Sequence, residues 1–264
     1  MSERTSYDPG TPSWVELSGT PDVEASEDFY RELFGWEMPE QPSSAQLGGY
    51  RRAQLRGRDV AGVSPRMQEG MPTVWATYIA VEDAVATMAR VAEAGGQAIA
   101  EPMDVMDLGK MAVFSDPTGA VCGIWEPGTF VGAELVNEPG AFCWNELNTR
   151  DPDAAKAFYG EVFGWGIVEH EMPAESGGGT YVELQVGDQA VAGMLDMRGR
   201  MPDQVPPHWL TYFAVEDADA AVERIGRGGG QVVFGPVDIP AGRFAVATDP
   251  AGAAFAVIQL PEEA

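Results

Sequence analysis

The sequence predicts an α+β protein built as a tandem repeat of one domain, with four βαβββ units in all. The chain repeats its motifs in the same order, and it repeats them at nearly constant spacing. Trp14-Val15-Glu16-Leu17 returns as Trp144-Asn145-Glu146-Leu147, and Asp116-Pro117 returns as Asp249-Pro250. The offsets, 144−14=130 and 249−116=133, differ by only a few residues. A chain of 264 residues is long enough for two domains of ordinary size.

The first unit of each copy begins with a strand that alternates large apolar and polar residues, Trp14–Ser18 or Trp144–Asn148. Asp22 or Asp151 is placed to cap the following helix. Apolar residues then recur at i, i+4 and i+8, which predicts one helix face packed on a sheet. Glycine ends both helices. These glycines are Gly35 and Gly164, and the strands expected next in the second copy are Val182–Val186 and Ala190–Leu195.

The second unit of each copy repeats the pattern, and glycine runs end its helix. The stretch Pro127–Gly140, which has two Gly-Pro-type breaks, is expected to connect the copies, so we expect one domain over 1–130 and another over 131–264. The elements expected in the second units are the strands Thr77–Val81, Thr211–Val215, Lys110–Ser115 and Arg243–Thr248 and the helices Ala84–Ala94 and Ala218–Ile225.

Composition and charge exclude several partners. The net charge of −25, from 41 acidic and 16 basic residues, disfavours nucleic acid and anionic membranes, which both attract basic surfaces. No apolar run approaches the ~20 residues that span a bilayer, and the N-terminus lacks a signal-peptide core. Cys122 and Cys143 do not occupy equivalent places in the repeat, so we expect reduced thiols and a cytoplasmic protein.

The repeated motifs resemble those of the vicinal oxygen chelate superfamily, which includes glyoxalase I, bleomycin resistance proteins and extradiol dioxygenases. The similarity lies in Phe-Tyr-x-x-x-Phe-Gly-Trp at the end of the first helix and Asp-Pro-x-Gly-Ala before the last strand. The Trp-x-Glu-Leu strands and the Asn137–Ala141 connector resemble a tandem actinobacterial type labelled glyoxalase-like. The resemblance implies concave mixed sheets that form cups, but it leaves the chemistry open.

The resemblance also implies where a metal would be bound, on the concave face of each sheet. Such a site needs several nitrogen or oxygen ligands around one point. The chain has only two histidines, so we expect no metal and no cofactor. The corresponding positions are Trp14, Gly62, Ala76 and Gly123 in the first copy, and Trp144, Gly193, Leu210 and Ala256 in the second.

Strand alternation predicts which side chains face each cup. Large aromatic residues beside small ones would form either a slot for a flat apolar ligand or a packed interior. The candidate ligand-binding residues are Trp14, Tyr78, Trp125, Trp144, Asn148, Leu210 and Tyr212, with Glu183 at the rim.

Three residues are candidates for acid–base catalysis: Glu16, Glu146 and His208. A carboxyl beside Trp would be partly desolvated, which raises its pKa and suits it to proton transfer. The alternative is a structural pair with Lys110 or Arg243. His208 has no counterpart in the first copy, where Val74 stands, so the second cup is chemically richer.

Three functions remain open. The first is metal-independent binding of an apolar or aromatic small molecule, linked to resistance or secondary metabolism. The second is a metal-free isomerase, cyclase or lyase that uses Glu146 with His208. The third is a glyoxalase- or dioxygenase-like metal enzyme with displaced ligands, such as Glu16, Glu146 and Glu183. A tandem chain can complete both cups alone, so we expect a monomer or a homodimer.

Overall fold

A computed structural model of the chain describes residues 3–39, 44, 46–172 and 178–261. Four helices and fifteen strands occur in the described part, in the order that the repeat predicts. They are β1 Pro12–Thr20, α1 Val23–Phe34, β2 Arg51–Leu55, β3 Arg58–Pro65, β4 Val74–Ala80, α2 Ala84–Glu93, β5 Gln97–Val105, β6 Gly109–Ser115, β7 Val121–Pro127, β8 Phe142–Thr149, α3 Pro152–Phe163, β9 Gly166–Glu171, β10 Thr180–Val186, β11 Gln189–Asp196, β12 His208–Ala214, α4 Ala218–Arg227, β13 Gln231–Ile239, β14 Gly242–Thr248 and β15 Ala254–Gln259.

Each copy of the repeat forms one mixed sheet. The first sheet has the order β2-β3-β1-β4-β7-β6-β5, and the second has the order β13-β14-β15-β12-β8-β11-β10-β9. The two units of a copy join through antiparallel pairs at the sheet centre, β1 with β4 and β8 with β12. The fold class is therefore as predicted. At the place in the first copy that corresponds to β9 of the second copy, Glu37 and Gln54 form an isolated bridge.

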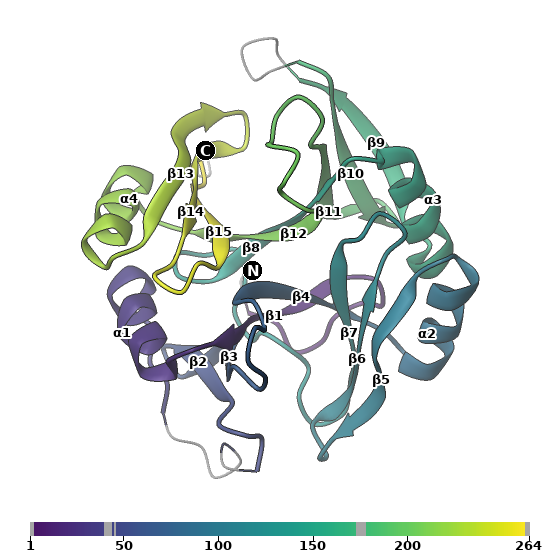
Figure 1. Cartoon of the computed structure of the whole chain (residues 1–264), viewed down its shortest axis with the longest axis horizontal. Helices are drawn as coiled ribbons and strands as arrows, with labels where there is room; N and C mark the ends of the chain where they lie inside the picture. The colour runs from purple at the N-terminus through teal and green to yellow at the C-terminus, as the bar shows by residue number, and fades with distance from the viewer. Residues whose placement is uncertain (1–2, 40–43, 45, 173–177, 262–264) are drawn as a thin grey trace.

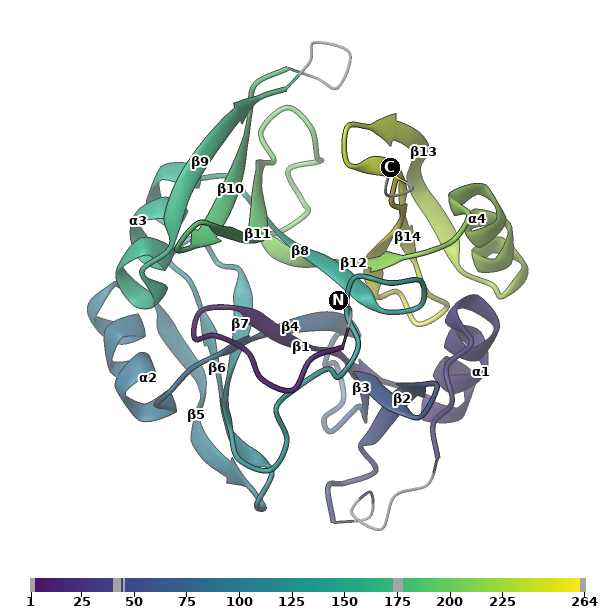
Figure 2. The same cartoon turned by 180° about the vertical axis from the view of Figure 1, so that it is seen from behind.

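The two sheets lie back to back, and their concave faces open in opposite directions (Figure 1). Contacts between β4 and β12 hold the convex faces together. The helices pair across the two copies, α1 with α4 and α2 with α3, on either side of this junction (Figures 1 and 2). At its centre, Thr77 donates a 2.8 Å hydrogen bond to Oδ1 of Asn145 in the other sheet.

Local sequence signals set the helix ends as expected. The carboxylate of Asp22 accepts a hydrogen bond from the backbone amide of Ala25, and that of Asp151 accepts one from the amide of Ala154, each at 3.1 Å. Each bond satisfies a free amide of the first helical turn. Gly35 and Gly164 adopt left-handed conformations with φ of 75° and 70° and end their helices.

The repeated aromatic motifs build the junction between the copies. Tyr30 of α1 packs on Trp75 and on Phe255 of the second sheet. Trp36 donates from its indole nitrogen to the Gly140 carbonyl at 2.6 Å, and Trp165 donates to Gly10 at 2.8 Å. Because both copies contribute to one shared core, the motifs that define the repeat are scaffold residues.

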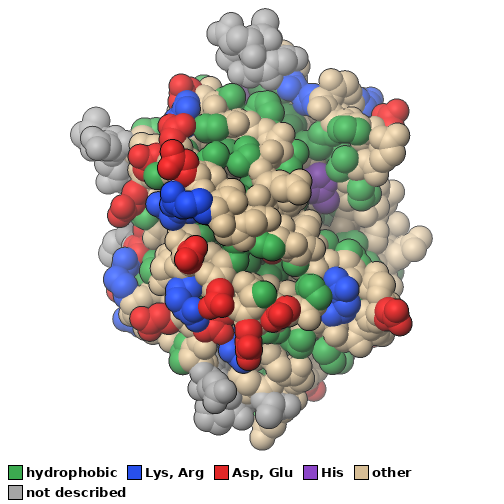
Figure 3. Space-filling model, turned by 60° about the vertical axis from the view of Figure 1, so that its left-hand side comes forward, with side chains coloured by type: hydrophobic (Ala, Val, Ile, Leu, Met, Phe, Trp, Pro, Cys, Tyr) green, Lys and Arg blue, Asp and Glu red, His purple; other side chains and the backbone are tan. Residues whose placement is uncertain are grey.

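The surface agrees with the acidic composition. Acidic side chains are spread over the face drawn in Figure 3, with Lys and Arg among them. In the described part of the chain, no helix is long and apolar enough to cross a membrane. Cys122 and Cys143 are both free, as expected.

Candidate functional site

The concave faces of the sheets carry the same small constellation twice. We call the concave face around Trp14, Glu16, Tyr50 and Tyr78 the first cup. The second cup is the face around Trp144, Glu146, Tyr181 and Tyr212. Each of these matching sets combines one indole, one carboxyl and two phenols.

A hydrogen bond from Trp to Tyr organises each cup. Nε1 of Trp14 donates to the Tyr50 hydroxyl at 2.9 Å, and Nε1 of Trp144 donates to the Tyr181 hydroxyl at 2.9 Å. The two tyrosines were not predicted as central residues, although their offset, 181−50=131, lies within the spacing of the repeat.

A glycine makes room for each of these tyrosines. A Cβ at Gly62 would overlap the Tyr50 hydroxyl, and a Cβ at Gly193 would overlap the Tyr181 hydroxyl. The register places each glycine directly beside the carboxyl-bearing residue, Gly62 with Glu16 and Gly193 with Glu146. Gly62 and Gly193, where the resemblance implies a metal ligand, are therefore each covered by a tyrosine of the same copy.

Glu16 accepts a 2.7 Å hydrogen bond from the Ser64 hydroxyl in the first cup. Desolvation by burial raises the pKa of Glu16 to about 7, and hydrogen bonds from Ser64, Tyr78 and Ser18 oppose that rise. Its carboxyl group therefore titrates near neutral pH.

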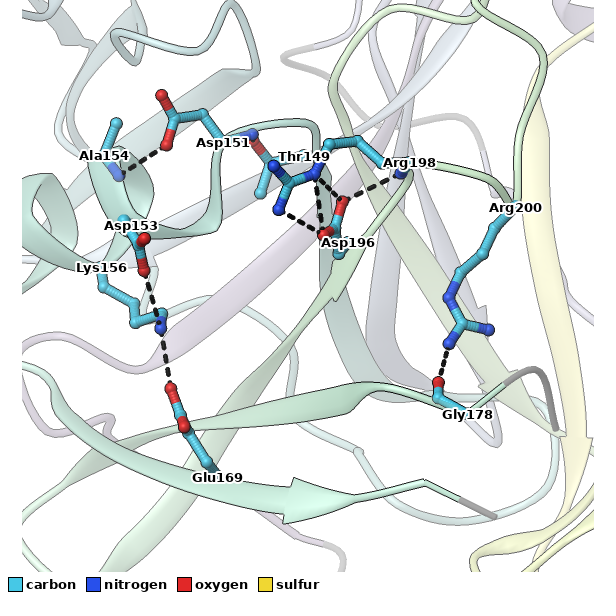
Figure 4. A network of polar contacts seen from close by, with 10 residues as sticks. All are labelled: Thr149, Asp151, Asp153, Ala154, Lys156, Glu169, Gly178, Asp196, Arg198 and Arg200. Atoms are coloured by element: carbon cyan, nitrogen blue, oxygen red, sulfur yellow. Dashed lines mark hydrogen bonds and ion pairs between the residues drawn. The ribbon is translucent and has the colours of Figure 1, made fainter. Parts of the chain in front are cut away.

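Glu146 is the more buried of the two carboxyls, with 5% of its surface exposed. Tyr212 donates to it at 3.2 Å and Asn148 at 3.3 Å. Burial raises the pKa of Glu146, while the Tyr181, Tyr212 and Asn148 hydrogen bonds and the charge of Arg200 lower it. Arg200 follows β11 and donates to the Gly178 carbonyl (Figure 4).

His208 starts β12 and pairs in register with Asn148. Its Nδ1 lies 2.9 Å from the Pro206 carbonyl, which can only accept a hydrogen bond, so Nδ1 carries the proton. Burial lowers the pKa of His208, which favours the neutral ring with Nε2 as an acceptor. Among the described residues, no hydrogen bond joins His208 to Glu146.

The other predicted residues fall into two groups. Tyr78, Trp125, Leu210 and Tyr212 lie on the concave faces and are nearly buried. Glu183 lies in the row of Gly193 and Glu146, but its carboxylate is bound to His170 at 2.8 Å.

The proposed pairing of the cup carboxyls with Lys110 or Arg243 is wrong. Lys110 lies 3.7 Å from Asp104, and Arg243 binds Asp219 at 2.9 Å and also contacts Asp238. Lys110 lies on β6 and Arg243 lies on β14, and each forms ion pairs with acidic residues of neighbouring elements. Neither residue therefore supplies a cation to a cup.

The donor set does not fit a divalent metal. The registers place Glu16 beside Gly62 and Ala76, and they place Glu146 beside Gly193 and Leu210. Throughout the described ranges, no group of three His, Cys, Asp or Glu side chains is arranged to hold a metal ion. Glu16 also lies in a different sheet from Glu146 and Glu183, so these three carboxylates cannot form one ligand set.

Comparison with protein families gives the same fold assignment. The model for the Glyoxalase/Bleomycin resistance protein/Dioxygenase superfamily matches residues 17–122 and again 141–257. The chain belongs to this superfamily. The two matches correspond to the two sheets, so both copies are members in their own right.

Two relatives align with nearly the whole chain. The chain is 44% identical over 263 residues to "Putative glyoxylase CFP32" of Mycobacterium tuberculosis, with 98% of each chain covered. It is 41% identical over 274 residues to "Anthracycline biosynthesis protein DnrV" of Streptomyces peucetius, covering 98% of this chain and 96% of that protein.

Solved structures support the fold alone. A Mn(II)-bound glyoxalase from Novosphingobium aromaticivorans aligns with a TM-score of 0.63 at 16% identity, covering 98% of this chain and 83% of the other. The 2,3-dioxygenase LapB from Pseudomonas sp. KL28 aligns with a TM-score of 0.63 at 15% identity, covering 95% and 93%.

Proposed function

We propose that the protein binds a flat aromatic small molecule in a cup without using a metal. The observation that carries this proposal is the donor set, in which an indole, two phenols and one buried carboxyl stand where metal ligands would be needed. Apolar cavities with a few polar groups are the usual sites for small molecules. Aromatic rings supply most of the contact area in such a site, and the carboxyl and phenols orient polar groups of the ligand.

The relatives suggest a ligand class. DnrV of Streptomyces peucetius and DauV of Streptomyces sp. carry the description of anthracycline biosynthesis proteins and are 41% and 40% identical to this chain. Anthracyclines are fused-ring aromatic quinones with phenolic hydroxyls. A ligand of that shape presents flat apolar faces to Trp and Tyr and hydrogen-bonding groups to Glu146. We place this role in the cytoplasm, where the free thiols of Cys122 and Cys143 would persist.

The test uses 1,4-dihydroxyanthraquinone as the probe and tryptophan fluorescence as the signal. We expect micromolar concentrations of the probe to quench the tryptophan fluorescence of the chelator-treated protein in a saturable manner. Saturable binding that appears only after a divalent metal is added would overturn metal-free binding. An absence of binding with and without metal would overturn the ligand class.

A second candidate function is acid–base catalysis at the same cup. Glu146 is buried, and burial raises its pKa. His208 lies on the neighbouring strand β12, two residues before Leu210, which pairs with Glu146. Burial lowers the pKa of His208, which favours the neutral ring. Such groups suit proton transfer in an isomerase or lyase. Mass spectrometry of the probe after incubation separates the two functions. An unaltered probe supports the binder, and a product that disappears with Glu146→Gln supports the enzyme.

A further inference from the structure

The connector between the two copies enters the first cup. The Phe130 ring lies 4.8 Å from the Trp14 ring, edge to face at 90°, and 5.8 Å from the Trp125 ring. The guanidinium carbon of Arg52 lies 5.3 Å from the Phe130 centroid. These three partners come from β1, β7 and β2, and strand register places all of them on the concave face. Phe130 therefore occupies a position inside the cup.

The backbone around Phe130 is fixed by hydrogen bonds to the same domain. Trp125 donates from Nε1 to the Phe130 carbonyl at 2.8 Å, and the Phe130 amide donates to Leu108 at 3.1 Å. Farther along, Ala133 donates to the Ser13 carbonyl at 2.8 Å. Trp14 is only 4% exposed beneath this segment. The aromatic surface of the first cup is thus covered by the protein itself.

The second cup has a different composition at the equivalent positions. Trp125 pairs with Ala80 in the first sheet, and Ile258 pairs with Ala214 at the corresponding place in the second sheet. Likewise, Arg52 pairs with Gly62 in the first sheet, and Glu183 pairs with Gly193 in the second. Two of the three side chains that contact the Phe130 ring are therefore replaced, and only the tryptophan at the position of Trp14 is kept, as Trp144.

Trp144 is less covered than its counterpart, because it is only partly buried whereas Trp14 is 4% exposed. Among the described residues no aromatic ring contacts Trp144 as Phe130 contacts Trp14, and the indole nitrogen of Trp144 donates to Tyr181. Around it the concave face forms its own apolar cluster with Leu210, Tyr212 and Ile258.

The second cup also offers a polar group that the first lacks. Asn148 stands in the place of Ser18, and its Oδ1 is buried without a hydrogen-bond partner among the described residues. A buried carbonyl oxygen without a partner costs free energy, so a donor that reaches it is favoured. Glu146 lies next to Asn148 and binds its amide nitrogen.

We propose that Phe130 is an intramolecular occupant of the first cup, and that only the second cup takes a ligand. This inference rests on the proposed function and adds the site and the orientation. The ligand ring lies edge to face on Trp144, as Phe130 lies on Trp14, which is a preferred arrangement of aromatic pairs. Its phenolic hydroxyl donates to Oδ1 of Asn148. The first copy then serves as scaffold, and the chain binds one ligand.

The experiment is an isothermal titration with 1,4-dihydroxyanthraquinone on wild type and three variants. We expect one site per chain for wild type, at least tenfold weaker binding for Trp144→Leu, and unchanged binding for the matched control Trp14→Leu. Phe130→Ala should add a second site. Two sites in wild type, or a loss with Trp14→Leu but not with Trp144→Leu, would overturn the inference.

A measurement without ligand keeps the two proposals distinguishable. Acrylamide quenching of tryptophan fluorescence reports exposed indoles, and removal of the Phe130 ring uncovers Trp14. We expect Phe130→Ala to increase the quenchable fraction while the circular dichroism spectrum stays native. No increase would show that Phe130 does not cover the cup. If quenching increases but no variant binds the probe, the occlusion holds and the proposed ligand class fails.

Discussion

Tyr30 of the first copy donates a 2.9 Å hydrogen bond to Oδ2 of Asp249 in the second copy. The same contact occurs in reverse, because Tyr159 of the second copy donates to Asp116 of the first at 3.0 Å. Each tyrosine hydroxyl also accepts a hydrogen bond from a tryptophan, Trp75 at 2.9 Å or Trp209 at 3.0 Å. Two reciprocal relays therefore fasten the copies together.

Removing one hydroxyl should weaken this junction. Tyr30→Phe leaves the buried Asp249 carboxylate and the Trp75 indole each short of a partner, which costs about 1–3 kcal/mol. Urea unfolding of the variant should show a lower free energy of unfolding with an unchanged dependence on urea. Tyr159→Phe should cost a similar amount.

The control for this prediction is a double-mutant cycle with Asp249→Asn. Because the two side chains are in contact, the combined loss should differ from the sum of the single losses. Strict additivity would show that the contact carries no energy.

Gly193→Ala should disturb the second cup without affecting the rest of the fold. The added methyl would overlap the Tyr181 hydroxyl and displace it from Trp144 and Glu146. Overpacking of this kind costs about 1–3 kcal/mol. Thermal unfolding and the fluorescence of the free protein report the cost and the displaced ring.

Gly226→Ala is the matched control. Gly226 lies within α4, and a Cβ there would meet nothing within 4 Å. Alanine in a helix is favoured over glycine by about 0.5–1 kcal/mol, so this variant should be at least as stable as wild type. Equal effects of the two substitutions would contradict the close approach of Tyr181 to Gly193.

Stability should fall as the pH rises toward neutral because of Glu16. Its pKa is raised from 4.5 to about 7 by burial, so the folded state holds a proton that the unfolded state has lost. The stabilisation is complete below pH 4.5 and disappears as pH passes 7, and it amounts to on the order of 3 kcal/mol. Melting temperatures from pH 5 to 8 measure it.

Glu16→Gln should flatten this dependence, because glutamine resembles the neutral carboxyl. A residual slope is expected from Glu146, whose pKa is raised in the same direction. Glu161→Gln, on the exposed side of α3, is the control and should keep the wild-type slope. A wild-type slope in Glu16→Gln would refute the assignment of neutral Glu16.

The sequence predicts the scaffold well because its signals are local. Asp22 caps a helix through a contact three residues away, and Gly35 ends the helix through its own backbone conformation. The two-sheet arrangement follows from the repeat itself. Strand alternation also placed Trp144, Glu146 and Tyr212 on one face.

The site was harder to predict because its contacts are distant in the chain. Nothing local to Phe130 indicates that it packs on Trp14, and nothing local to Arg243 indicates that it pairs with Asp219 rather than a cup carboxyl. The aromatic motifs were recognised as repeated, but periodicity reports burial and not the partner. Their role at the junction depends on contacts between the two sheets, which the repeat alone does not specify.

The central claim is that the second cup binds an aromatic ligand without a metal. The most direct measurement is the affinity of the chelator-treated, metal-analysed protein for 1,4-dihydroxyanthraquinone, before and after one equivalent of Mn(II). The account predicts saturable binding in both conditions with dissociation constants that agree within twofold, and no retained manganese after gel filtration. Stoichiometric manganese together with an affinity at least tenfold higher in its presence would contradict the account.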